Sequence, residues 1–139
     1  MEVNGYVILE DPKIFYSKDH LWMKLENGKV RVGITDYAQK MLRDVLYIEL
    51  PSEGSTVKQG EPFGSIESIK VVSDLVSPIS GVVIEVNNEL MDRPELVNED
   101  PYSAGWMLVI DPSNLEAELG NLMSPEAAAE WLKEVIKGA

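Results

Sequence analysis

Lys70 is the residue whose surroundings most suggest chemistry, because two similar segments converge on it. Gly60 lies ten residues before the lysine, and Gly81 lies eleven residues after it. The stretches 64–69 and 71–76 between these glycines have the composition of two strands that meet at Lys70. Apolar residues flank the lysine directly, which is unusual for an exposed turn. The pattern predicts a hairpin that holds Lys70 at its tip, in contact with solvent.

The rest of the chain offers little for catalysis. There is no cysteine, which excludes disulfides, thiolate nucleophiles and thiolate metal sites. His20 is the single histidine, so a Ser–His–Asp triad would have to be built on it, and a metal site of several histidines is excluded. Redox or acyl chemistry must therefore come from a group attached to the chain or from a partner.

Charge narrows the set of partners. The 139 residues include 12 basic and 24 acidic side chains, a net charge of −12. Nucleic acids and anionic membrane surfaces are bound by clustered Lys and Arg, so we expect neither as a partner. No apolar run approaches the roughly 20 residues of a membrane helix. The acidity either serves solubility alone or guides the chain to basic partner surfaces.

Short strands separated by Gly, Pro and Asn dominate the middle of the chain. Segments 21–25 and 30–34 flank Asn27-Gly28, a strong signal for a hairpin turn. Further strand-like runs are 45–50, 63–69, 71–76, 82–86 and 106–110. Many short strands with little helix between them indicate a barrel or a sandwich.

Three helical segments accompany the strands. Asp36 and Gln39 resemble a capping pair at the start of the first helix. Two more helices are expected within about 113–137, the last of them capped by Ser124 with Pro125 at its first position. We therefore expect a mainly β fold with small helices and a C-terminal helix. Residues 1–139 are interpreted as a single domain, with the lysine hairpin at about 57–86.

The motifs around the lysine resemble those of a known family. Val57-x-x-Gly60-Glu61, Glu67-Ser68-x-Lys70, Ser73-Asp74 and Ser77-Pro78-x-Ser80-Gly81 together resemble the biotinyl/lipoyl attachment pattern in the form found in glycine cleavage H proteins. The resemblance extends to segments 32–39, 45–51 and 98–106, so that it covers roughly residues 14–135. It implies a lipoyl-type barrel-sandwich hybrid.

Other families with a modified lysine fit less well. Biotin carriers place Met on both sides of the lysine, where this chain has Ile69 and Val71. Lipoyl domains of 2-oxo acid dehydrogenases usually have Asp before the lysine and Ala after it. They are also shorter and lack the segments 33–39 and 98–106.

The resemblance implies a carrier and not an enzyme. Lipoate would be attached to Lys70 as N6-lipoyl-lysine by a lipoyl-attaching enzyme. The arm would carry an aminomethyl group from glycine decarboxylase to the aminomethyltransferase and be reoxidised by dihydrolipoamide dehydrogenase. A monomer suits a carrier that visits several enzymes. The N-terminus shows neither a signal nor a transit pattern, so we expect a cytoplasmic protein.

Four further residues receive roles from the resemblance. Glu67 and Asp74 correspond to recognition features for the attaching enzyme, and Asp74 is also placed to contact the arm. The alternative for both is a solvated carboxylate at a strand end. His20, with Asp19 beside it, corresponds to the surface on which the loaded arm rests. Structural packing is the alternative for a single His beside an aromatic residue.

The chain departs from the family pattern at three positions. Leu21 stands where Glu is typical between His and Trp, and a carboxylate is the group suited to hold a cationic amine. Met41 and Arg43 stand where the family often has a polar residue and Gly. These departures motivate a second hypothesis, an H-like lipoate-binding paralogue that serves sulfur oxidation or lipoyl relay. A third hypothesis is an interaction protein without a prosthetic group.

Overall fold

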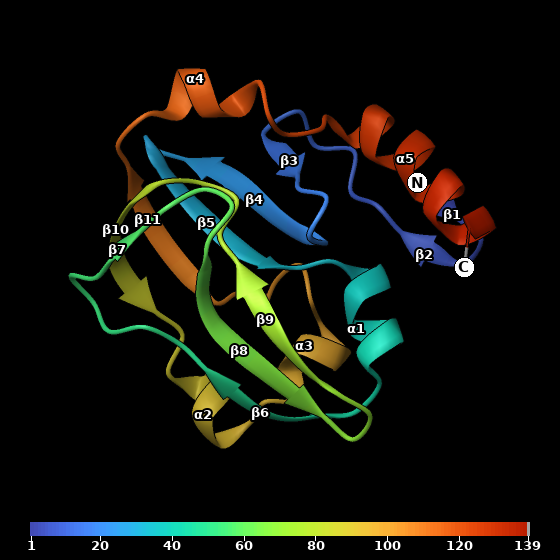
Figure 1. The fold of residues 1–139 in the computed structure, drawn as a ribbon, viewed down its shortest axis with the longest axis horizontal. Helices are drawn as coiled ribbons and strands as arrows, with labels where there is room; N and C mark the ends of the chain where they lie inside the picture. Colours follow the sequence, from blue (N-terminus) through green and yellow to red (C-terminus); the bar gives the residue numbers. More distant parts are fainter. Residues whose placement is uncertain (139) are drawn as a thin grey trace.

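Two antiparallel sheets form the body of the molecule (Figure 1). The computed structural model describes residues 1–138. The larger sheet has the strand order β3 (Ile14–Tyr16), β4 (Leu21–Glu26), β5 (Lys29–Ile34), β11 (Leu108–Pro112), β10 (Gly81–Val86) and β7 (Thr56–Val57). The smaller sheet has the order β6 (Val45–Glu49), β8 (Pro62–Ser68) and β9 (Val72–Val76). The expected mainly β, lipoyl-type barrel-sandwich fold is confirmed.

The main core contains apolar side chains from both sheets. Alternation along the strands places Val30 and Val32 of β5 in this core, together with Ile66 of β8 and Ile110 of β11. All four are at most 1% exposed. Full burial of such a side chain contributes about 1.5–3 kcal/mol, so this core is the main source of stability for the two sheets.

The β4–β5 hairpin has the turn that its sequence predicts. Asn27 and Gly28 both have positive φ, 51° and 78°, as a two-residue turn between twisted strands requires. Further along, Gly33 pairs with Trp22 across the two strands. A Cβ at Gly33 would lie 2.7 Å from the indole of Trp22, so glycine makes room there for a buried aromatic side chain.

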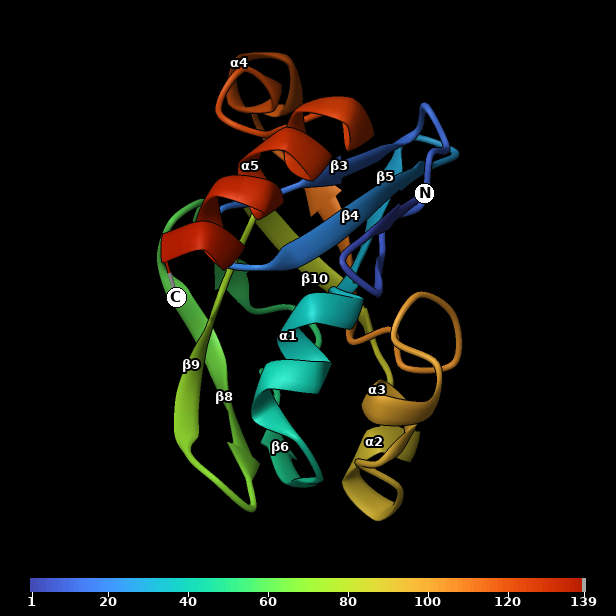
Figure 2. The same ribbon diagram turned by 90° about the vertical axis from the view of Figure 1, so that its right-hand side faces the viewer.

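A second core lies under the C-terminal helix α5 (Pro125–Gly138). Ser124 accepts a hydrogen bond from the amide of Ala127 at 3.2 Å, which confirms the expected cap. Figure 2 shows α5 crossing the outer side of β3 and β4. Ala128 and Leu132 are buried in this second core with Tyr16 of β3. The helix therefore covers the sheet on the face turned away from the main core.

The capping prediction for helix α1 (Asp36–Leu42) is wrong by one residue. Thr35 is the cap, because its hydroxyl accepts from the amide of Ala38 at 3.2 Å. Asp36 is the first helical residue, and its carboxylate accepts a hydrogen bond from the amide of Val7 instead. Threonine supplies the same cap chemistry as aspartate, so the sequence offered two candidates at adjacent positions.

The remaining small elements were predicted to begin too early or were not predicted at all. Helix α4 (Leu115–Leu119) begins after the expected residue 113, because Asp111 and Pro112 still pair with β10. Six short elements were not among the predicted strands and helices: β1 (Glu2–Val3), β2 (Tyr6–Val7), β3, β7, α2 (Glu89–Asp92) and α3 (Leu96–Glu99). Their two to four residues are too few to show a period. Within residues 1–138, no helix has the length and apolar character needed to cross a membrane.

Candidate functional site

Lys70 lies at the tip of the β8–β9 hairpin. The two strands pair from Pro62 opposite Val76 to Glu67 opposite Val72, and the lysine lies exposed in the connection 68–71. At the base of the hairpin, the segment before β8 lies beside the segment after β9. The amide of Gly60 donates there to the carbonyl of Ser77 at 2.9 Å. The predicted hairpin tip is confirmed.

Ser68 holds the shape of this tip. Its hydroxyl oxygen accepts from the amides of Lys70 and Val71, both at 3.1 Å. The amide of Ile69 donates to the carbonyl of Asp44 at 2.9 Å, which ties the tip to the segment before β6. The backbone donors around the lysine are thus paired within the fold. Sequence reasoning did not assign this role to Ser68, although a serine two residues before an exposed turn position is a known signal for such bonds.

Apolar side chains surround the tip. We call Leu46, Tyr47, Ile69, Val71 and Val72 the apolar collar. Ile69 and Val72 are 66% and 70% exposed, and the other three are between 43% and 56% exposed. Large apolar side chains are usually buried, so their joint exposure beside the lysine is a distinctive feature of this surface.

Glu67 lies on the outer face of the smaller sheet. It pairs with Tyr47 on one side and with Val72 on the other, so an exposed carboxylate sits between two members of the apolar collar. Glu67 is near the lysine along the hairpin. It is not among the residues that line the groove described next.

A groove of about 170 Å³ runs between α1 and β9. Asp19, His20 and Asp74 all line this groove, although they are far apart in the sequence. The structure therefore brings together three of the four accessory residues predicted from sequence and leaves Glu67 outside. The remaining lining side chains are mostly apolar and come from β4, β5, α1, β8 and β9: Leu21, Ile34, Tyr37, Ala38, Met41, Leu42, Ile66, Ser73 and Leu75.

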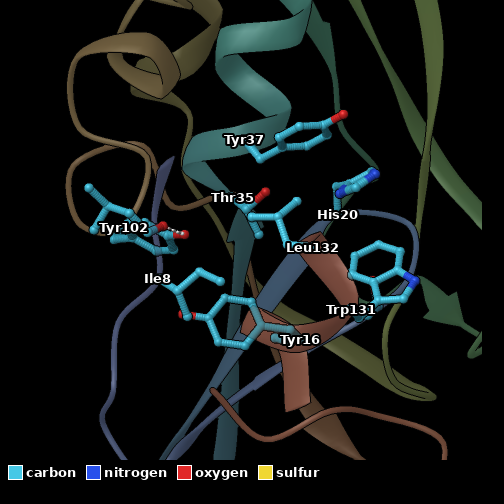
Figure 3. A pocket seen from close by; sticks show the side chains of 11 residues that line it. Ile8, Tyr16, His20, Thr35, Tyr37, Tyr102, Trp131 and Leu132 are labelled. Atoms are coloured by element: carbon cyan, nitrogen blue, oxygen red, sulfur yellow. Dashed lines mark hydrogen bonds between the residues drawn. The ribbon is translucent and has the colours of Figure 1, made fainter. Parts of the chain in front are cut away.

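The imidazole of His20 stacks between two aromatic rings (Figure 3). Its centroid is 4.7 Å from that of Tyr37 and 5.0 Å from that of Trp131. Burial lowers the pKa of His20 below the ordinary 6.5, while the nearby charge of Asp19 acts in the opposite direction. The imidazole is therefore mainly uncharged at neutral pH. Neither aromatic partner was predicted to contact His20.

The three departures from the family pattern have different structural settings. Leu21 is 2% exposed and belongs to the main core while it also lines the groove. Met41 is 41% exposed and lines the same groove. Arg43 lies outside the groove, at the C-terminal cap of α1, with φ 65° and ψ −149°. Within residues 1–138, no three His, Asp or Glu side chains are arranged to hold a metal ion.

Comparison with known proteins decides the family. The family model described as "Glycine cleavage H-protein" matches residues 14–135. The chain belongs to this glycine cleavage H-protein family. Members of the family are lipoyl carriers of the glycine cleavage system, and this chain has that carrier role.

Similar proteins cover nearly the whole chain. The "Probable glycine cleavage system H protein" of Pyrococcus abyssi is 52% identical over 136 residues, which are 97% of this chain and 99% of the relative. The "Glycine cleavage system H protein" of a Geobacillus species is 50% identical over 119 residues, 86% of this chain and 93% of the relative. The crystal structure of a glycine cleavage system H protein from Mycobacterium marinum matches with a TM-score of 0.77. That match has 38% sequence identity and covers 86% of this chain and 96% of the other.

Proposed function

We propose that Lys70 is the residue of this H protein that carries the lipoyl group, joined through an amide to the side-chain amine. The observation that carries the proposal is the position of Lys70 at the exposed tip of the β8–β9 hairpin. Among residues 1–138, no hydrogen-bond or ion-pair partner holds its amine, so a modifying enzyme can reach it without breaking the fold. When bound, the lipoyl group supplies the sulfur redox chemistry that a chain without cysteine lacks.

The groove between α1 and β9 suits the resting place of such an arm. Its apolar floor, which includes Leu21 and Leu42, matches a hydrocarbon chain. Asp19 and Asp74 add two exposed carboxylates at the groove, and a carboxylate binds a cationic amine by charge-assisted hydrogen bonds. These two residues therefore hold the aminomethyl cargo in our proposal, and His20 forms part of the wall.

The partner enzymes follow from this role. We propose glycine decarboxylase as the donor of the cargo, the aminomethyltransferase as its acceptor, and dihydrolipoamide dehydrogenase as the enzyme that reoxidises the arm. A lipoyl-attaching enzyme would recognise Glu67 and the apolar collar beside Lys70, together with Asp74. The chain would act as a monomer in the cytoplasm, with residues 1–139 as a single carrier domain.

The position of Leu21 gives no reason to assign another cargo. Its side chain is 2% exposed within the main core, so a glutamate there would bury a carboxylate. Asp19, two residues earlier, is exposed and lines the groove. The groove thus retains a carboxylate on this segment, and the sulfur-oxidation or relay hypothesis has no structural support.

Mass spectrometry tests the attachment site. After incubation with a lipoyl-attaching enzyme and lipoate, the intact chain should gain the mass of one lipoyl group, and Lys70→Arg should abolish the gain. Lys58→Arg, at another exposed lysine outside the hairpin tip, should be modified like the wild type. Modification that persists in K70R would overturn the assignment.

The carrier role has a separate test. Lipoylated protein mixed with glycine decarboxylase, glycine and labelled bicarbonate should support exchange of the carboxyl carbon of glycine. A fully lipoylated chain that supports no exchange with a competent decarboxylase would contradict the proposed partner.

A further inference from the structure

His20 and Tyr37 form a wall between two separate spaces. Both residues line the groove between α1 and β9, and both also line a small cavity on the other side. Trp131 lines the cavity but not the groove. The indole therefore contacts the imidazole from behind, on the side away from the space where the arm is proposed to rest (Figure 3).

Within residues 1–138, the imidazole lies against two aromatic rings, each tilted by 36° to it. The hydrogen bonds of His20 are made by its backbone, with the carbonyl of Ser17 and the amide of Thr35 as partners. Its ring nitrogens have no hydrogen-bond partner in the described part of the chain, whereas Tyr37 and Trp131 cover its two faces. The ring can therefore keep its orientation only while both aromatic partners stay in place.

Trp131 is itself held firmly. Ala128 and Leu132 precede and follow it on α5, and these two residues are only 3% and 4% exposed in the second core. The helix cannot move away from the sheet without exposing them. The backbone that carries the indole is therefore fixed against the sheet, and loss of the indole would leave one side of the imidazole without its aromatic neighbour.

We infer that Trp131 is a positioning residue, which holds the imidazole of His20 in the wall of the groove so that this wall fits the loaded arm. The inference rests on the proposed function for the meaning of the groove, but the position of the ring can be tested without any arm. Asp19 and Asp74 line the groove beside His20, and Tyr37 covers its other face. On α5, Trp131 is the residue stacked on the imidazole, and it carries no charge.

Nuclear magnetic resonance of the unmodified chain provides the first test. Because His20 is the single histidine, its ring signals need no assignment by mutation. Trp131→Met keeps a long apolar side chain on the helix but removes the aromatic ring. We expect this variant to move the ring proton shifts of His20 and to bring its pKa closer to 6.5. Trp131→Phe, which keeps an aromatic ring, should restore most of the wild-type shifts and pKa.

A matched control separates positioning from general loosening of the helix. Ile136→Ala weakens α5 in the same core, but Ile136 lines neither the groove nor the cavity. It should lower the melting temperature and leave the shifts and pKa of His20 unchanged. Wild-type shifts and pKa in W131M, or equal changes in W131M and I136A, would overturn the inference.

The second test uses the loaded carrier and a double variant. W131M should shorten the lifetime of the bound cargo roughly two- to ten-fold, the range expected for the loss of one aromatic pair. His20→Asn removes the imidazole with a residue that tolerates the positive φ of 66° at this position. In the H20N background, W131M should have no further effect, and an undiminished effect there would overturn the inference. A wild-type carrier that accepts no cargo would reject the proposed function, while the magnetic resonance result would still decide the role of Trp131.

Discussion

Arg43 has a backbone conformation that glycine adopts with the least strain. Its φ of 65° and ψ of −149° lie in a region that side chains with a Cβ rarely occupy. The family usually has Gly at this position, and these backbone angles explain why glycine is suited to it. Asp44, the next residue, accepts the hydrogen bond that ties down the lysine-bearing tip. The chain tolerates the strain because hydrogen bonds hold the backbone on both sides of Arg43. One of them runs from the side-chain amide of Asn98 to the carbonyl of Arg43 at 2.7 Å.

Arg43→Gly should therefore stabilise the protein. Relief of the strain, partly offset by the greater freedom of Gly in the unfolded chain, is expected to raise the free energy of unfolding by about 1 kcal/mol. Urea denaturation measures this change. Arg43→Ala is the control, because it removes the same side chain but keeps the Cβ, and it should give no such gain. Equal stability of R43G and R43A would show that the conformation of Arg43 is not strained.

The sequence predicted the position of Lys70 but not the two aromatic rings beside His20, and the difference has a physical reason. The hairpin around Lys70 is a local feature, so strand composition and the two glycines were enough to place it. The groove needed long-range information, which the family resemblance supplied for Asp19, His20 and Asp74. The stack of His20 on Trp131 joins the start of β4 to the C-terminal helix. No local period predicts such a pair, since helix and strand patterns show only which face of each element is buried.

Asp36 connects β2 to α1, next to the edge-on contact between the rings of Tyr6 and Tyr37. Its carboxylate accepts from the amide of Val7 in β2 at 2.9 Å, and from the side chains of Gln39 and Lys40 within α1. Burial alone would raise the pKa of Asp36, but the hydrogen bonds and the charge of Lys40 outweigh burial and lower the pKa below 3.8. The ionised carboxylate therefore fastens the β1–β2 hairpin to α1.

The pH dependence of stability should show this contact. A carboxyl group whose pKa is lower in the folded state stabilises the protein above pH 3.8, and this contribution is lost as the pH falls through the folded pKa. Asp36→Asn should reduce the free energy of unfolding by about 1.5–3 kcal/mol at pH 7, the range for hydrogen bonds to a charged group. The difference between D36N and the wild type should shrink below pH 3.8.

Urea denaturation across this pH range measures the difference. Asp11→Asn serves as the control. The Asp11 carboxylate forms a surface ion pair with Lys24 at 3.7 Å and accepts an exposed hydrogen bond from the amide of Lys13 at 2.9 Å, so the loss of stability should be small at every pH. A difference between D36N and the wild type that persists unchanged at pH 3 would contradict the role of the ionised carboxylate.

Among the secondary-structure elements, alternating apolar patterns predicted strands reliably, whereas very short elements could not be predicted. The longer strands of the two sheets, β4, β5, β6, β8, β9, β10 and β11, were expected near their observed positions, because each contributes side chains to the main core. Helices α2 and α3 have four residues each, so neither completes a repeat. They form because their buried residues, Leu90 of α2 and Leu96 and Val97 of α3, contact the rest of the core. Contacts with residues that are distant in the sequence leave no pattern within the four residues of the helix itself.

The charge of the whole molecule affects how it meets its partners. The proposed lipoylation of Lys70 would remove one of the 12 positive charges, which would change the balance from −12 to −13. A strongly acidic surface attracts basic surfaces at long range and raises association rates. The two interpretations of this acidity, solubility alone or guidance of partners, therefore differ in their salt dependence.

Association with the proposed partner enzymes should slow as salt is added. Screening shortens the reach of charges to about 10 Å at 0.1 M ionic strength, so steered association is expected to fall by roughly ten-fold or more between low and high salt. Stopped-flow measurement of the association rate with glycine decarboxylase, repeated at several salt concentrations, gives this dependence. Dissociation rates, which depend on close contacts, should change much less. An association rate that is independent of salt would leave solubility as the role of the acidic surface.

The bonding pattern at the hairpin tip has a consequence for the life of the protein before it is modified. Ser68 and Asp44 satisfy the backbone of the tip, and the amine of Lys70 has no partner within residues 1–138. The fold of the tip therefore does not require a group attached to the lysine. Newly made chains can therefore fold before they are modified, and an attaching enzyme would meet a folded substrate. The fraction of working carrier would then depend on how fast attachment follows folding.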